Sequence, residues 1–184
     1  MAKFQCVDEL VKALHPIDPV YCLRKKSLKL AANWFKNNFP GDVLYAIKCN
    51  PADLVIKSLI KYGISHFDAA SIDEIKLIKK ISPSSTIYFM HPVKKESSIR
   101  EAYFSYGVKA YSYDSKEELE KILKVTKNAN DLELFLRIQA SNEHAEIDLS
   151  KKFGANNNEA ITLARVGRLK SKLFAFSFHV GSQC

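Results

Sequence analysis

Segments with strand and helix patterns alternate along most of this 184-residue chain. The predicted strands are Val43–Ile47, His66–Ala70, Thr86–Met90, Ala110–Tyr113, Leu132–Ile138 and Leu173–His179. The predicted helices are Lys25–Asn38, Ala52–Tyr62, Ser71–Ile81, Lys95–Tyr106, Lys116–Asn128 and Asn158–Lys170. Alternation with short connections predicts a parallel sheet with right-handed crossovers, which is either an open doubly wound sheet or a (β/α) barrel.

Turn and cap residues support these helix limits. Ser71 and Ser115 each have a glutamate three residues later, which is the spacing of a helix-capping box. Gly63 and Gly107 follow two of the helices at the position where glycine favours a helix end.

Ionisable side chains follow the predicted strands at regular intervals. They are Lys48, Asp68, His91, Asp114, Arg137 and His179, and the first five recur after 20, 23, 23 and 23 residues. In a barrel these positions all lie on the rim where active sites are built. Strand ends are often polar because loops begin there, but that accounts for one or two positions more easily than for six. An open sheet that binds a dinucleotide would carry GxGxxG after an early strand, and no such motif occurs.

Lys48 is the most informative of these residues, because it directly follows the apolar run Val43–Ile47. Burial lowers the pKa of a lysine, and a partly neutral lysine is a nucleophile for aldehydes. The alternative is that a lysine at the end of a strand simply reaches solvent.

Composition limits the class of protein. A hydrophobic fraction of 47% with 26% charged residues predicts a soluble globular chain, without a membrane span or a secretion signal. Four scattered cysteines without zinc spacing favour a reducing, cytoplasmic location and no metal. The net charge of +8 raises the question of nucleic acid. Acidic residues interleave with the basic ones and no recognition module is visible, so we expect no nucleic-acid partner.

The number of strands is lower than a closed barrel requires. Six strands are predicted after residue 42, whereas a barrel of this kind has eight. The chain stops soon after His179, so we expect the barrel to be unfinished and one apolar sheet edge to be uncovered.

Several short motifs make the chain similar to a known family. Tyr45–Pro51, Phe67–Ser71 with Glu74, Lys151–Ala155 and Phe178–Ser182 resemble segments of the fold-type III pyridoxal-phosphate decarboxylases. The ornithine/lysine decarboxylase group is the most similar. The resemblance implies an α/β fold, the pyridoxal-phosphate-binding (β/α)8 TIM-type barrel of the alanine racemase/ornithine decarboxylase type, truncated here after about six units. Residues 25–184 would be this partial barrel. Residues 1–24 would be an N-terminal segment whose strand, Val20–Leu23, pairs with a C-terminal β domain that this sequence lacks.

The resemblance also implies a role for individual residues. Lys48 would bind pyridoxal 5'-phosphate as a Schiff base and later act in proton transfer. His179 would stack on the pyridine ring, and Ser182 would help to hold the phosphate. Asp68 and Arg137 would line the pocket near the cofactor.

Two further positions follow from the same resemblance. Glu74 would support the pocket from the helix after its strand, and Lys152 would reach across a dimer interface. The implied reaction is decarboxylation of a basic amino acid, of ornithine or lysine type, to a diamine by a homodimer, in polyamine biosynthesis.

Two alternatives remain open beside this enzyme. The chain could be an inactive homologue that only binds the cofactor or acts as a decoy subunit, or a single-domain carrier of pyridoxal phosphate. Family members have a second half that supplies the cysteine proton donor and the groups that bind the distal amine of the substrate. We therefore expect residues 1–184 alone to show little or no turnover.

Overall fold

Six parallel strands form one sheet in the computed structural model of the protein, which describes residues 3–140, 145–146 and 152–181. The strands are β1 (Leu44–Ala46), β2 (His66–Ala69), β3 (Thr86–Phe89), β4 (Ala110–Tyr113), β5 (Glu133–Arg137) and β6 (Leu173–Ser177). Their order in the sheet is their order in the chain, and every neighbouring pair is parallel. Each predicted barrel strand is confirmed, with ends that differ by no more than two residues.

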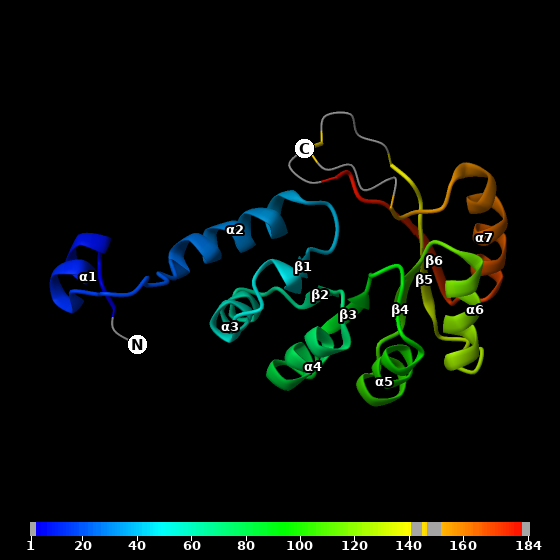
Figure 1. Ribbon diagram of the computed structural model, residues 1–184, viewed down its shortest axis with the longest axis horizontal. Helices are drawn as coiled ribbons and strands as arrows, with labels where there is room; N and C mark the ends of the chain where they lie inside the picture. The colour runs from blue at the N-terminus through cyan, green and yellow to red at the C-terminus, as the bar shows by residue number, and fades with distance from the viewer. Residues whose placement is uncertain (1–2, 141–144, 147–151, 182–184) are drawn as a thin grey trace.

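The helices between the strands lie on one side of the sheet. They are α3 (Asp53–Lys61), α4 (Ile72–Ile81), α5 (Glu96–Tyr106), α6 (Lys116–Val125) and α7 (Asn157–Leu169), and α2 (Lys25–Asn38) precedes β1. Figure 1 shows the strands in an arc with α3 to α7 around its outer side. A doubly wound sheet would have helices on both faces, so this arrangement is that of a barrel.

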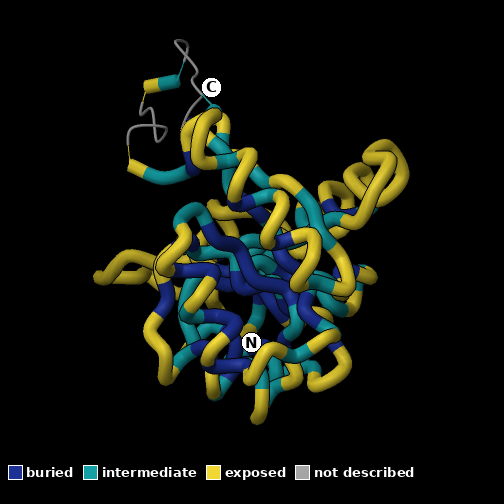
Figure 2. The backbone as a smooth tube through the Cα atoms, turned by 90° about the vertical axis from the view of Figure 1, so that its right-hand side faces the viewer, coloured by how far each residue is buried: buried dark blue, intermediate teal, exposed yellow. Residues whose placement is uncertain are grey.

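The core lies between the sheet and the helices. Phe67 and Ala69 of β2 are fully buried, whereas His66 and Asp68, which alternate with them, are half-buried and face the concave side. Ile87 and Phe89 of β3 repeat the pattern. Figure 2 shows buried backbone concentrated in the centre and exposed backbone on the outer turns. The concave side therefore carries the half-buried alternate residues, which include both polar and aromatic side chains, with Tyr88 and Phe135 in contact.

Local capping signals are confirmed. The hydroxyls of Ser71 and Ser115 accept hydrogen bonds from the amides three residues later, each at 3.2 Å. Gly107 ends α5 with φ of +65°, in the left-handed region that costs glycine little.

The N-terminal segment contains no described strand, and the pairing of Val20–Leu23 with a C-terminal β domain stays a prediction. Val20–Leu23 forms no strand, because no other described strand lies beside it to complete a ladder of hydrogen bonds. Instead α1 (Val7–Leu14) forms, and it stands apart from the sheet in Figure 1. Apolar residues at Val7, Leu10, Val11 and Leu14 have the helical spacing that could have predicted it. None of the helices in the described ranges is long and apolar enough to cross a membrane.

Candidate cofactor site at the carboxyl ends of the strands

The strand register brings the predicted rim residues together in pairs. Ala46 pairs with Asp68, and Lys48 lies two residues beyond Ala46. At the opposite edge of the sheet, between β5 and β6, Arg137 pairs with Ser177, and His179 lies two residues beyond Ser177. Because all the strands are parallel, these four side chains start from the same end of the sheet.

Lys48 lies in a single 3-10 turn, η1 (Ile47–Cys49), which replaces the predicted last residue of the strand. The turn is fixed by the residue that follows it: the Asn50 side-chain oxygen accepts from Ala52 N at 3.1 Å, and the Tyr45 hydroxyl donates to Asn50 O at 3.3 Å. Lys48 itself is exposed. Of the two alternatives for Lys48, burial or contact with solvent, the structure therefore shows the second, since the chain turns outward immediately after Ile47, which is fully buried.

Asp68 is a carboxylate that the charge of this lysine affects. Burial raises the pKa of Asp68, Lys48 and Arg137 lower it, and Glu74 raises it. The Glu74 carboxylate accepts from Ala70 N at 2.7 Å, so it is held at the end of β2, where the resemblance places it. The charge of Asp68 is therefore affected by two cations, Lys48 and Arg137, and by one anchored carboxylate, Glu74.

Arg137 connects the two sides of the rim electrostatically. Burial lowers its pKa, while Asp114 and Asp68 raise it. His91 lies in the same field, since its pKa is lowered first by burial and then by Lys94, Arg137 and Lys48. A neutral imidazole at His91 follows from these contributions.

His179 is oriented by its own loop. Gly181 N donates to His179 Nδ1 at 2.9 Å, which places the proton of the neutral ring on Nε2. Burial, Arg137 and Lys48 all lower the pKa of His179. Gly181 is buried with φ of +94°, a conformation that favours glycine. Ser182, predicted to help to hold phosphate, lies outside the described residues.

Asp114 is committed to a local contact. Its Oδ2 accepts from Gly154 N at 2.9 Å, so the carboxylate anchors the segment around Gly154. It is a rim residue, as its spacing predicted, but its hydrogen-bonding partner is the backbone.

A buried ion pair below the rim was not predicted. Lys94 and Glu118 have side chains that are 0% and 3% exposed and lie 3.0 Å apart. Lys94 Nζ also donates to His91 O at 2.8 Å and to Ser112 O, and Lys121 pairs with the other carboxylate oxygen of Glu118. Lys94 lies two residues after Pro92 and directly before Lys95. In the sequence it therefore looks like a loop lysine, and no pattern indicates its burial.

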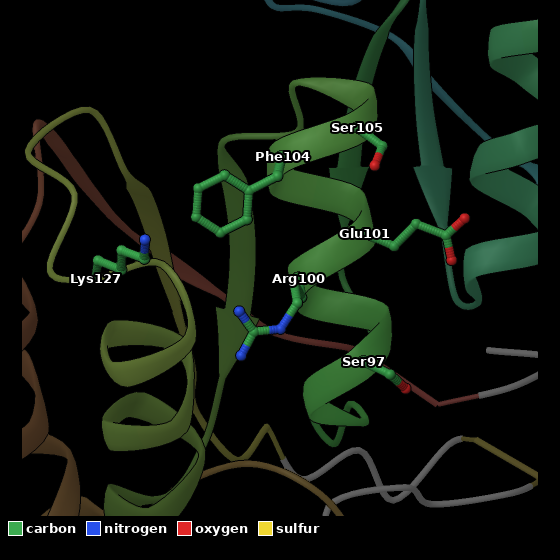
Figure 3. A pocket seen from close by; sticks show the side chains of 6 residues that line it. All are labelled: Ser97, Arg100, Glu101, Phe104, Ser105 and Lys127. Carbon is green, nitrogen blue, oxygen red and sulfur yellow. The ribbon is translucent and has the colours of Figure 1, made fainter.

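The outer helices carry a shallow hollow that is remote from the rim. It is lined by Ser97, Arg100, Glu101, Phe104, Ser105 and Lys127. In Figure 3, Phe104 and Arg100 extend from α5 toward the end of α6, where Lys127 lies with Nζ 5.9 Å from the Phe104 ring centroid. None of the predicted site residues contributes to this hollow, so we do not assign the cofactor to it.

Comparisons with known proteins agree with the barrel and its rim. Residues 25–184 match the family model described as "Pyridoxal-dependent decarboxylase, pyridoxal binding domain". The chain belongs to this family. It is 31% identical to the lysine/ornithine decarboxylase of Selenomonas ruminantium over 100% of its own length and 47% of that protein. It is 34% identical to mouse ornithine decarboxylase over 85% of its length and 33% of that protein.

Solved structures give the same result. The arginine decarboxylase of Paramecium bursaria Chlorella virus superposes with a TM-score of 0.86 at 31% identity, over 97% of this chain and 48% of the viral one. The chain thus spans between a third and about half of the length of these relatives. The fold is that of the barrel domain of pyridoxal-phosphate-dependent decarboxylases, and pyridoxal phosphate is the cofactor of the domain.

The rim of this decarboxylase domain suits pyridoxal phosphate, which is an anionic aromatic aldehyde. Lys48 supplies an exposed primary amine, and Arg137 supplies a second cation. On the strands below the rim, the hydroxyls of Ser112 and Ser177 are buried without a hydrogen-bond partner among the described residues. Unpaired buried polar groups are uncommon, and they are found where a ligand or water completes a site. The donor set present therefore fits the cofactor.

Proposed function

We propose that Lys48 binds pyridoxal phosphate covalently and that the enzyme built on this domain decarboxylates a basic amino acid. The observation that carries the proposal is the convergence of Lys48, Asp68, Arg137 and His179 at one end of the sheet, where Lys48 and Arg137 lower the pKa of Asp68 and of His179. When bound, pyridoxal phosphate supplies an electron sink for the electron pair that stays on the substrate when carbon dioxide leaves.

The side chains of the rim have separate tasks. The Lys48 amine holds the cofactor and, once released from it, moves protons at Nζ. The neutral His179 ring would stack on the aromatic ring of the cofactor, and Gly181 N orients the imidazole by donating to Nδ1. Asp68 and Arg137 line the pocket, and Ser182 adds a donor for the phosphate. Glu74, anchored on Ala70 N, keeps the end of β2 in place.

The substrate class follows from the relatives. They are named as ornithine, lysine/ornithine and arginine decarboxylases, and solved relatives are described in complex with agmatine, putrescine and cadaverine. We place the substrate of this enzyme in the ornithine or lysine group, with a diamine as product for polyamine biosynthesis.

Assembly and location are part of the proposal. We expect a homodimer, with Lys152 directed to the partner subunit, because the Lys151–Ala155 segment resembles the family segment that reaches across a dimer interface. We expect a cytoplasmic enzyme because the cysteines of the described segments, Cys6, Cys22 and Cys49, are free and exposed, as in a reducing compartment.

The experiment measures carbon dioxide released from carboxyl-labelled ornithine, lysine and arginine. It uses the longest natural polypeptide that contains this sequence, with Lys48→Ala as the matched control. Release from one basic amino acid that Lys48→Ala abolishes supports the proposal. Cofactor binding at Lys48 without release from any of the three would replace it with a binding-only function.

A further inference from the structure

We propose that Phe153 is a positioning residue of the rim, whose ring holds the guanidinium of Arg137 and the imidazole of His91 in fixed places. This inference rests on the proposed function, because it assigns a support to a residue that we place in the cofactor pocket. It concerns the protein without cofactor as well, so it can be tested separately.

The ring contacts two predicted rim residues from different strands, and Lys152 Nζ also lies 5.1 Å from its centroid. Arg137, at the end of β5, has its guanidinium carbon 5.2 Å from the Phe153 ring centroid. His91, after β3, meets the same ring with centroids 5.7 Å apart and planes at 73°, an edge-to-face contact. Within the described ranges, no hydrogen bond or ion pair holds the Arg137 guanidinium. The face of the aromatic ring is therefore its main directional contact, of the cation–π kind.

The backbone around Phe153 is tied to the strand that carries Arg137. Ala155 N donates to Arg137 O at 2.8 Å, and Gln139 N donates to Ala155 O at 3.1 Å. Gly154 N donates to Asp114 at 2.9 Å on the neighbouring strand. These bonds lie on both sides of Arg137, so the ring of Phe153 has a defined place relative to it.

Gly154 allows this close approach. Its φ is +102°, and a Cβ built on it would lie 2.7 Å from Gln139 N and from Ile138 C. A side chain at 154 would therefore push the segment away from β5 and move Phe153 with it. The Phe153-Gly154-Ala155 motif is explained by a ring that must reach the rim over a backbone packed against the strand.

The consequence for the site is electrostatic. With the ring in place, Arg137 stays within reach of Asp68 and Asp114 and is separated from His91 by an apolar group. Without the ring, a long arginine side chain is free to turn into solvent. Its influence on Asp68 and on His91 would then fall together.

The test compares Phe153→Leu with Phe153→Tyr in the cofactor-free protein by NMR titration of His91 and Asp68. Leucine keeps apolar volume but removes the ring face, whereas tyrosine keeps the ring. Arg137 lowers the pKa of both groups, so Phe153→Leu should raise the pKa of both by more than the error of the titration. Phe153→Tyr should leave both within error of the wild-type protein. The ring signals of His66, at the opposite end of β2, should not move in either variant.

Arg137→Gln provides the matched control. It should raise the pKa of His91 and of Asp68 by itself, and adding Phe153→Leu to it should then change neither further. If Phe153→Leu does not fold, Phe153→Met is measured in the same way. The proposal is overturned if Arg137→Gln shifts the two titrations and Phe153→Leu or Phe153→Met does not, or if Phe153→Tyr acts like leucine. A protein that fails to take cofactor at Lys48 still gives either result, so the two proposals fail separately.

Discussion

Replacing Lys94 by methionine removes a charge from the interior while nearly keeping its length. The side chain is 0% exposed, and its ammonium group lies 3.0 Å from Glu118, whose side chain is 3% exposed. It also supplies donors to the carbonyls of His91 and Ser112. Methionine can occupy the apolar part of this space but cannot replace any of these contacts.

The expected loss follows from burial. Removing one partner of a buried ion pair costs about 3–5 kcal/mol, because the other charge stays desolvated. Glu118 keeps a second partner, since Lys121 pairs with its other oxygen and is only 24% exposed. We therefore expect Lys94→Met to lower the free energy of unfolding by about 3 kcal/mol, at the lower end of that range.

Lys76 provides a control of equal geometry. Its Nζ lies 3.0 Å from Glu101, the same separation, but the two side chains are 43% and 38% exposed. An exposed pair contributes little because water screens it, so Lys76→Met should cost much less than Lys94→Met. Urea unfolding followed by far-UV circular dichroism measures both. Equal losses for Lys94→Met and Lys76→Met would refute the reasoning from burial.

The pH dependence gives a second measurement on the same residue. Burial lowers the pKa of Lys94 to about 8, although Glu118 raises it. In the unfolded chain the lysine keeps its proton up to about pH 10.4, so between these values the unfolded state binds more protons at this position. This contribution to stability is present above the unfolded pKa and is lost as pH falls through the folded pKa. The stability difference between wild type and Lys94→Met should therefore widen from pH 8 to pH 10.

Three further predictions concern the capping, turn and histidine residues. Gly154→Ala should lower the free energy of unfolding by more than the roughly 1–2 kcal/mol cost of a left-handed backbone, since the new Cβ would lie 2.7 Å from Gln139 N. At Gly107 a Cβ would meet nothing within 4 Å, so Gly107→Ala should cost only the backbone amount. Denaturant unfolding compares the two variants. Ser71→Ala should cost about 1 kcal/mol in the same assay by removing the N-cap of α4, and Ser71→Asp should restore most of it. NMR titration should place the pKa of His179 below 6.5. Because the folded pKa is lowered, the contribution of His179 to stability is present above the unfolded pKa and is lost as pH falls through the folded pKa. His179→Gln should remove this part of the dependence of stability on pH.

The barrel strands could be predicted because their signals are local. The strands are runs of β-branched and aromatic residues, and polar residues about 23 positions apart end them. These patterns predict the bounds of β4 as observed and the ends of the other five strands to within two residues. Ser71 and Ser115 are caps because a hydroxyl and an amide three residues apart need nothing else from the fold.

The remaining features depend on tertiary contacts that a local pattern does not contain. Val20–Leu23 has strand composition, but a strand requires a neighbour, and none of the described strands lies there. Lys94 is buried because Glu118, 24 residues later, faces it from the next crossover. Lys48 is exposed because a 3-10 turn replaces the last predicted strand position. The burial of a lysine therefore cannot be read from its apolar neighbours in the chain.

The most direct test of the central claim is the position of the covalent cofactor. The protein is incubated with pyridoxal phosphate, reduced with borohydride and digested, and the phosphopyridoxyl group is located by mass spectrometry. The account predicts one dominant modified peptide, which carries the group on Lys48, and its loss in Lys48→Arg with the other lysines unchanged. Modification spread over exposed lysines, or undiminished in Lys48→Arg, would contradict it.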